Sequence, residues 1–258
     1  MSVAPDRLDG RWAVVTGGSK GIGAATAEAL AAVGANLALV ARGRDDLERC
    51  AEQLRGRGHP DQRIVTRTVD VADPDDIGDL FGWLADEIPQ LDVFVANAGT
   101  GHTRPLLDIT LDEWQGMLDL NLTGVMLCCQ GAARLMLDNP GGDRAILVVS
   151  SIRALQATPG RLAYSTTKAA VNQLVRVAAA ELAPHGIRVN GLSPGITDTP
   201  LTRQFPDAFD EAVAKVPMGR AAHADDVAAA ARFLCTEMSR FTTGTNLIVD
   251  GGESLPGR

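Results

Sequence analysis

The chain has 258 residues, of which 45% are hydrophobic and 22% charged, proportions that fit a globular protein and exclude a disordered one. Its formal net charge of −8 gives no general attraction to nucleic acid or to an anionic membrane, so neither is an expected partner. The first residues lack the basic and apolar segments of a signal peptide, and the apolar stretch at 27–41 is interrupted and too short to cross a bilayer.

Short apolar runs alternate with longer helical patterns along the whole chain. Strands are expected at residues 12–16, 36–41, 64–69, 91–96, 145–150, 187–192 and 246–249. Helices are expected from the turn after residue 16 to about residue 33, and near 45–55, 75–88, 112–137, 162–182 and 225–235. Strands that are apolar on both faces, each followed by a helix, indicate a parallel sheet covered on both sides. The prediction is an α/β fold: one doubly wound (Rossmann) domain over residues 1–258, with about seven parallel strands and helices on both faces.

A glycine-rich turn joins the first strand to the first helix. It reads Thr16, Gly17, Gly18, Ser19, Lys20, Gly21, Ile22, Gly23. Glycine permits a tight turn and a close approach of the backbone to a ligand, and the N–H groups at a helix N-terminus attract an anion. The turn therefore predicts a site for the pyrophosphate of a dinucleotide. The alternative is a glycine-rich connection without a ligand.

Tyr164 and Lys168 stand four residues apart in an expected helix, and Tyr164 is the only tyrosine of the chain. Residues at this spacing lie on one helix face, one turn apart. An ammonium group there would lower the pKa of the phenol, which is about 10 in a model peptide, and would make Tyr164 a general acid or base. An incidental pair on an amphipathic helix is the alternative.

A serine follows the fifth expected strand, thirteen residues before Tyr164. Ser151 would lie at the carboxyl edge of the sheet, where open α/β sheets bind ligands, and its hydroxyl can hold the substrate oxygen. Ser150 is adjacent and competes for the same role.

The ordered motifs resemble the compact branch of the short-chain dehydrogenase/reductase family, over nearly the whole chain. The glycine turn has the family's spacing, and further matches follow in order. They are Asp70-Val71, Asn97-Ala98-Gly99, Asn121, Ser151, Tyr164 with Lys168, Pro194-Gly195 with Thr199, and Val249 to Gly252. The family spacing favours Ser151 over Ser150.

The resemblance implies roles for these positions. Tyr164 would exchange a proton with the substrate oxygen, Ser151 would orient the substrate, Lys168 would also bind the nicotinamide ribose, and Asn121 would continue a proton relay to solvent. No metal site is expected, since nicotinamide carries the hydride chemistry. The predicted cofactor-binding residues are Gly17, Ser19, Lys20, Gly21, Ile22, Gly23, Arg42, Asp70, Val71, Asn97, Ala98, Gly99, Tyr164, Lys168, Pro194, Gly195, Thr197 and Thr199.

The expected cofactor is NADP(H). Related enzymes that prefer NAD have an aspartate at the end of the second strand, where this chain has Ala41 followed by Arg42. Lys20 adds a second cation inside the glycine turn. A 2′-phosphate requires positive charge, so both residues favour NADPH. Alternatively, Arg42 belongs to the solvated start of a helix.

The substrate is expected to be a small carbonyl compound or secondary alcohol. Besides Ser151, the loops around the site bring three candidate contacts: His102, Arg153 and Gln156. Arg153 can pair with a substrate carboxylate or phosphate, or it can be a rim arginine that points to water. His102 can equally be an ordinary loop histidine.

Three other functions compete with a ketone reductase. Reductases of 3-oxoacyl-carrier-protein thioesters typically carry arginines where this chain has Gly142 and Ala180, although Arg144 and Arg176 lie nearby. An NADPH-binding sensor without turnover need not keep both Tyr164 and Lys168. Sugar-nucleotide epimerases and dehydratases usually have a longer C-terminal region and a different glycine spacing.

The assembly and the compartment are expected from weaker signals. By resemblance, the chain forms a homo-oligomer, a tetramer or a dimer, through the two long helices. The four cysteines show no metal-ligand spacing and suit a reducing cytoplasm.

Overall fold

The computed structural model describes residues 4–58, 61–139 and 141–255. Seven parallel strands form the central sheet, in the order β3-β2-β1-β4-β5-β6-β9. The strands are β1 (Trp12–Thr16), β2 (Asn36–Ala41), β3 (Ile64–Thr68), β4 (Val93–Ala96), β5 (Arg144–Val149), β6 (Ile187–Pro194) and β9 (Asn246–Val249). The predicted doubly wound sheet of seven strands is confirmed.

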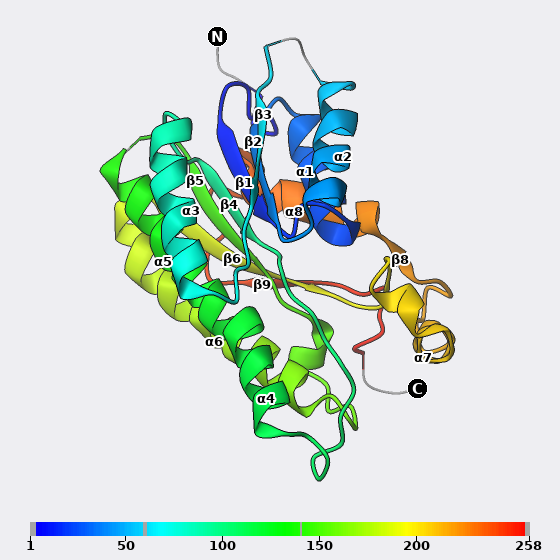
Figure 1. Ribbon diagram of the computed structural model, residues 1–258. Coiled ribbons are helices and arrows are strands. Elements are labelled where there is room, and N and C mark those ends of the chain that lie inside the picture. Colours follow the sequence, from blue (N-terminus) through cyan, green and yellow to red (C-terminus); the bar gives the residue numbers. More distant parts are fainter. Residues whose placement is uncertain (1–3, 59–60, 140, 256–258) are drawn as a thin grey trace.

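Helices cover both faces of the sheet, as Figure 1 shows. One layer holds α1 (Gly21–Ala31), α2 (Arg44–Arg55) and α8 (Ala224–Cys235). The opposite layer holds α3 (Pro74–Glu87), α5 (Gly124–Asp138) and α6 (Leu162–Leu182). Because the chain runs from β1 out to β3 and then returns to β4 beside β1, the order of strands reverses between β1 and β4. Ligands bind at the carboxyl ends of the strands flanking such a reversal.

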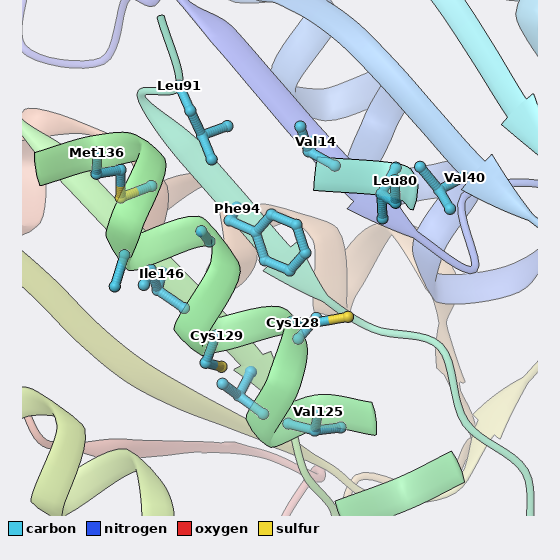
Figure 2. Packing of buried hydrophobic residues seen from close by; sticks show 14 of the residues in the cluster. Val14, Val40, Leu80, Leu91, Phe94, Val125, Cys128, Cys129, Met136 and Ile146 are labelled. Carbon is cyan, nitrogen blue, oxygen red and sulfur yellow. The ribbon is translucent and has the colours of Figure 1, made fainter. Parts of the chain in front are cut away.

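Two apolar cores lie on the two sides of the sheet. Successive side chains of a strand point to opposite faces, so Val14 joins one core while Ala13 and Val15 join the other. Phe94 is fully buried in the first core, where it packs with Phe81 at a centroid distance of 5.8 Å. Figure 2 shows Phe94 between the sheet and α5. The apolar character of both strand faces, on which the fold prediction rests, therefore reflects burial on both sides.

The fourth strand begins later than predicted. The expected strand at 91–96 is β4, from Val93 to Ala96. The residue before it, Asp92, is buried and accepts a hydrogen bond from the backbone N–H of Trp12 at 2.8 Å. The side chain of Asp92 thus binds the start of β1, and burial raises the pKa of its carboxyl group.

The long helix expected at 112–137 contains a break in its hydrogen-bond pattern. It consists of α4 (Leu111–Leu118), a π-helical turn (Asp119–Thr123) and α5. Insertions of this kind are frequent at functional sites. The turn contains Asn121, whose side chain bonds the backbone of the loop that follows β4.

The Pro-rich connection after β6 contains more regular structure than predicted. A two-stranded parallel sheet joins β7 (Thr197–Asp198) to β8 (Ala222–His223), and α7 (Pro206–Val213) lies between them in sequence. This segment extends beyond the carboxyl end of the main sheet, near α7 in Figure 1.

The helical run from Leu111 to Asp138 is long and apolar enough to cross a membrane by length and composition alone. Half of its most apolar window is buried inside this fold. A core helix satisfies the same criterion, and α5 packs in the core shown in Figure 2.

Candidate active site

One cleft of about 850 Å³ opens along the carboxyl ends of the central strands. Every residue that the sequence predicted to bind the cofactor lines this cleft, together with Ser151 and Arg153. Three predicted site residues, Asn121, His102 and Gln156, do not line it. The chain thus brings segments from the ends of six strands, β1 to β6, together at one site.

The glycine turn adopts a conformation that requires glycine. Gly17 and Gly21 have φ angles of +65° and +55°, which other residues rarely adopt. A Cβ atom on Gly23 would lie 2.2 Å from the carbonyl oxygen of Gly17, so α1 packs directly on the turn. The space that these glycines leave open is the close approach a pyrophosphate needs.

The start of α1 is free to bind an anion. Lys20 is its N-cap residue and makes no side-chain capping hydrogen bond. The first N–H groups of a helix lack partners within the helix, and the helix dipole favours negative charge there. The uncapped helix, with the glycine turn before it, fits the diphosphate of a dinucleotide.

Asn97 and Thr16 hold the glycine turn against the end of β4. The Asn97 amide donates to the carbonyl oxygens of Thr16 at 2.9 Å and Gly17 at 3.2 Å. In return, the Thr16 hydroxyl accepts from the backbone N–H groups of Asn97 and Ala98 at 3.0 and 3.1 Å. Asn97 was predicted as a cofactor contact, and in this structure its side chain braces the cofactor-binding turn.

Two ion pairs mark the end of the cleft near β2. Lys20 pairs with Asp46, and Arg42 pairs with Asp70 at 3.8 Å. Asp46 lines the cleft from the first turn of α2 and was not predicted as a site residue. The sequence signal for it is an aspartate that follows the basic Arg42-Gly43-Arg44 segment. Both predicted cations are thus at the site, each beside a carboxylate.

The catalytic end of the cleft holds Tyr164, Ser151 and Ser150. Burial raises the pKa of Tyr164, whereas a hydrogen bond with the Ser151 side chain lowers it. The Ser150 hydroxyl is directed elsewhere, since it donates to the Asn172 side chain at 2.6 Å. Ser151 is therefore the serine placed to share a substrate oxygen with Tyr164. The ring of Tyr164 packs on Gly101, where a Cβ atom would lie 3.0 Å from the ring.

Lys168 is nearly fully buried, with 4% of its surface exposed. Its ammonium group donates to the Val149 carbonyl oxygen at 2.8 Å and lies 5.9 Å from the Tyr164 ring centroid. Burial lowers the pKa of Lys168 to about 8. The charges that lower the Tyr164 pKa in this structure come from Arg161 and Arg153 rather than from Lys168, which differs from the expectation of a direct Lys168 effect.

Asn121 lies behind the cleft, in the π-helical turn. Its side chain accepts from the Thr100 N–H at 3.1 Å and donates to the Thr100 carbonyl oxygen at 2.8 Å. A Cβ atom on Gly99 would lie 3.0 Å from the Asn121 oxygen and 3.6 Å from the Lys168 ammonium. Asn121 and Lys168 therefore adjoin the same backbone position.

The segment after β6 closes the cleft opposite the glycine turn. Thr197 is buried and donates to the Gly195 carbonyl oxygen at 3.1 Å. Thr199 approaches the glycine turn across the cleft, because a Cβ atom on Gly21 would lie 3.3 Å from the Thr199 side chain. On the side of β3, Asp70 accepts from the Ala72 N–H at 3.0 Å, which fixes the turn after that strand.

The predicted substrate residues fall into different places. The Arg153 guanidinium pairs with Glu253 at 2.7 Å and donates to the Gln156 side chain at 2.8 Å. Arg153 is thus neither a free ligand nor a rim residue that points to water, the two roles considered from sequence. The His102 ring lies outside the cleft lining, close enough to Glu113 to lower the pKa of that carboxyl group.

Two residues near the catalytic end were not predicted as site residues from the sequence. Glu253 has 7% of its surface exposed, and besides Arg153 it binds the Ile196 N–H at 2.8 Å. It therefore ties the end of the chain to the loop after β6. Arg161 lines the cleft three residues before Tyr164. Its spacing from Tyr164 was a usable signal, whereas the pairing of Glu253 with Arg153 spans 100 residues and leaves no local pattern.

The fold and the cleft define a Rossmann-fold oxidoreductase, with a dinucleotide site at one end and a Tyr–Ser–Lys group at the other. The chain belongs to the short-chain dehydrogenase/reductase family, whose members use NAD(P)(H). The family profile described as enoyl-(acyl carrier protein) reductase matches residues 17–254.

Relatives cover almost the whole chain. A cis-4-hydroxycyclohexanecarboxylate dehydrogenase of Sinomonas cyclohexanicum is 42% identical, over 94% of this chain and 96% of its own. A glucose 1-dehydrogenase of Gluconobacter oxydans is 38% identical, over 98% and 95%. The crystal structure of a short-chain type dehydrogenase/reductase from Mycobacterium marinum superimposes with a TM-score of 0.93 at 34% identity, covering 98% of both chains. The names of these relatives share the reaction class and differ in substrate.

Proposed function

We propose that the protein transfers a hydride between NADP(H) and a ketone or secondary alcohol, with Tyr164 as the general acid and base. The observation that carries this proposal is the placement of Tyr164 and Ser151 together at one end of a cleft whose other end is an uncapped helix N-terminus, with Ser151 near enough to lower the pKa of Tyr164. A dinucleotide bound there would supply or accept the hydride.

The residues of the chain would then handle the oxygen and its proton. In reduction, the Tyr164 hydroxyl donates its proton to the carbonyl oxygen, and in oxidation it accepts the proton of the alcohol. The Ser151 hydroxyl binds the same oxygen and holds it beside Tyr164. Lys168 would bind the ribose next to the nicotinamide, and Asn121 would connect it to solvent through water. Asn121 and Lys168 both lie beside Gly99, and this proximity supports that relay.

The choice of NADP(H) over NAD(H) rests on Lys20 and Arg42. Both cations line the end of the cleft near β2, where the adenosine ribose would lie, and Ala41 stands where a competing carboxylate would be. A 2′-phosphate would take over the role that Asp46 and Asp70 have as their anionic partners.

Reduction of 3-oxoacyl-carrier-protein thioesters is the second candidate, and the burial of Arg144 is evidence against it. Arg144 is buried and donates to the carbonyl oxygens of Met136 and His185, the latter at 2.6 Å. It is therefore unavailable to an acidic carrier protein. Arg134 on α5 and Arg176 on α6 are both exposed cations on the two long helices. The spacing of Tyr164 and Lys168 also differs from that of the enoyl-reducing relatives.

We further propose that the protein is a cytoplasmic homo-oligomer. All four cysteines are buried free thiols, which suits a reducing compartment. Met126, Leu137 and Val177 expose apolar surface on α5 and α6, the helices through which the family associates.

The test of the proposed reaction is NADPH oxidation by the purified protein with neutral ketones, keto acids, sugar-like ketones and carrier-bound thioesters. We expect turnover with at least one free ketone. NADPH that binds tightly, with no turnover across the panel, would favour the sensor, and turnover confined to thioesters would favour the carrier-protein reductase.

The cofactor preference has its own test. In the double variant Lys20→Gln/Arg42→Gln, we expect the KM for NADPH to rise about 10-fold to 100-fold. Both side chains are exposed, so the two charge-assisted contacts together should contribute about 1.4–2.7 kcal/mol. The KM for NADH should change little. The matched control is Arg57→Gln, an exposed arginine paired with Glu28 outside the cleft. A similar rise in KM for both cofactors would show that the two cations do not recognise the 2′-phosphate.

A further inference from the structure

We propose that Arg161 binds a carboxylate group of the substrate, so that the substrate class is a hydroxy- or keto-carboxylate. This inference rests on the proposed function, since it concerns the same site, and it assigns the specificity that the catalytic residues leave open.

Arg161 is the residue before α6, three positions ahead of Tyr164, and both line the cleft. Residues three apart at a helix start lie on one face, with Cβ atoms about 5–6 Å apart. The positive charge of Arg161 lowers the pKa of Tyr164, as a nearby guanidinium would. A carboxylate bound by Arg161 would therefore lie a few bonds from the reacting carbon, whose oxygen exchanges a proton with Tyr164.

Arg161 is the arginine of the cleft that lacks an anionic partner. Within the described ranges, Arg42 has Asp70 at 3.8 Å and Arg153 has Glu253 at 2.7 Å, whereas the Arg161 side chain forms no ion pair or hydrogen bond. Arg161 is half-buried, and burial lowers its pKa, which reflects the cost of a cation without a partner. A guanidinium is always charged and offers a planar fork of donors that matches a carboxylate.

The backbone holds Arg161 in place before any ligand binds. The loop that follows β4 pairs with the segment before α6 in a parallel bridge between Arg104 and Arg161. The Arg104 N–H donates to the Gly160 carbonyl oxygen at 2.7 Å, and the Arg161 N–H donates to the Thr158 carbonyl oxygen at 3.1 Å. Since two loops of the site fix this segment, binding an anion there requires little reordering of the chain.

The deciding experiment is calorimetric binding of two probes of the same shape, cyclohexanecarboxylate and cyclohexanecarboxamide, to the protein saturated with NADP⁺. We expect the wild-type protein to bind the carboxylate about 10-fold to 100-fold more tightly than the amide, as a charge-assisted contact provides. Arg161→Gln should remove this preference, and Arg161→Lys should keep part of it. The control is Arg63→Gln, whose side chain pairs with Glu87 at 2.7 Å outside the cleft lining and should leave the preference intact.

Kinetics separate carboxylate binding from an electrostatic role in tuning Tyr164. With 4-oxocyclohexanecarboxylate and its amide as ketones, Arg161→Gln should lower kcat/KM for the acid about 10-fold to 100-fold and change the amide by less than about threefold. Equal losses with both ketones would mean that Arg161 acts only through Tyr164. The proposal would also fall if the wild-type protein bound both probes alike, or neither. A preserved carboxylate preference without hydride transfer to any ketone would overturn the proposed function and leave Arg161 as an anion-binding residue.

Discussion

Replacement of Tyr164 by phenylalanine is expected to lower kcat about 10²-fold to 10⁴-fold, the contribution typical of a positioned general acid. The ring remains to pack on Gly101, so the fold and the cleft are retained while the proton donor is lost. Affinity for NADPH should stay within about threefold of the wild-type value, because an interaction made only in the transition state affects kcat rather than binding. Steady-state kinetics measure kcat, and a fluorescence titration measures the affinity for NADPH.

Tyr164 is also the only tyrosine of the chain, which makes its ionisation directly measurable as tyrosinate absorbance. Because burial is the largest influence on Tyr164, we expect the cofactor-free protein to ionise above the ordinary pKa of 10.0. Ser151→Ala should raise that pKa further, since the hydrogen bond with Ser151 lowers it. Full activity in Tyr164→Phe, or a phenol that titrates below 10.0 without cofactor, would contradict this assignment.

The fold was predictable because its signals are local and repeated. Central strands such as β1 and β4 are apolar on both faces, and the glycine turn follows β1 directly. The spacing of Tyr164 and Lys168 fixes their common helix face in the same way. Each of these features depends on only a few neighbouring residues, so it can be predicted from the sequence alone.

The parts of the site that escaped prediction depend on contacts between distant segments. Arg153 has an unremarkable sequence context, and its partner Glu253 becomes visible only when the end of the chain returns to the cleft. Asp46 likewise enters the site because α2 packs beside the glycine turn and brings it to Lys20. Side-chain partners across the fold therefore decide which charged residues are free for a ligand.

The π-helical turn at Asn121 is a third example. The apolar periodicity of residues 112–137 indicates a helix and contains no sign of an inserted residue. The turn is recognised only with the loop after β4 in place, where Thr100 supplies both a donor and an acceptor for the Asn121 side chain. The role of Asn121 in the relay stays a prediction, and its geometry explains how an uncharged amide reaches the back of the cleft.

Replacement of Lys168 by methionine is expected to remove most activity and yet stabilise the cofactor-free protein. The buried ammonium has a pKa of about 8 against an ordinary 10.5, a difference that corresponds to about 3 kcal/mol against the charged form. Methionine avoids this cost but loses the hydrogen bond to Val149, worth about 1 kcal/mol. A net gain of about 1–2 kcal/mol in the free energy of unfolding at pH 7 follows, together with a loss of about 10²-fold or more in kcat/KM.

The pH dependence of this stability gain tests whether the charge of Lys168 causes it. Between pH 8 and pH 10.5 the unfolded wild-type chain binds more protons than the folded one, so the contribution of Lys168 to stability rises with pH across this window and is smallest below pH 8. The advantage of Lys168→Met, measured by urea unfolding, should therefore shrink as pH is raised from 7 to 10. Lys215→Met, at an exposed position, is the control and should change the free energy of unfolding by less than about 0.5 kcal/mol. A gain that stayed constant with pH would indicate better packing by methionine, whereas a loss at pH 7 would mean that the folded protein stabilises the Lys168 ammonium. A site that keeps a destabilising buried cation in this way fits selection for function over stability.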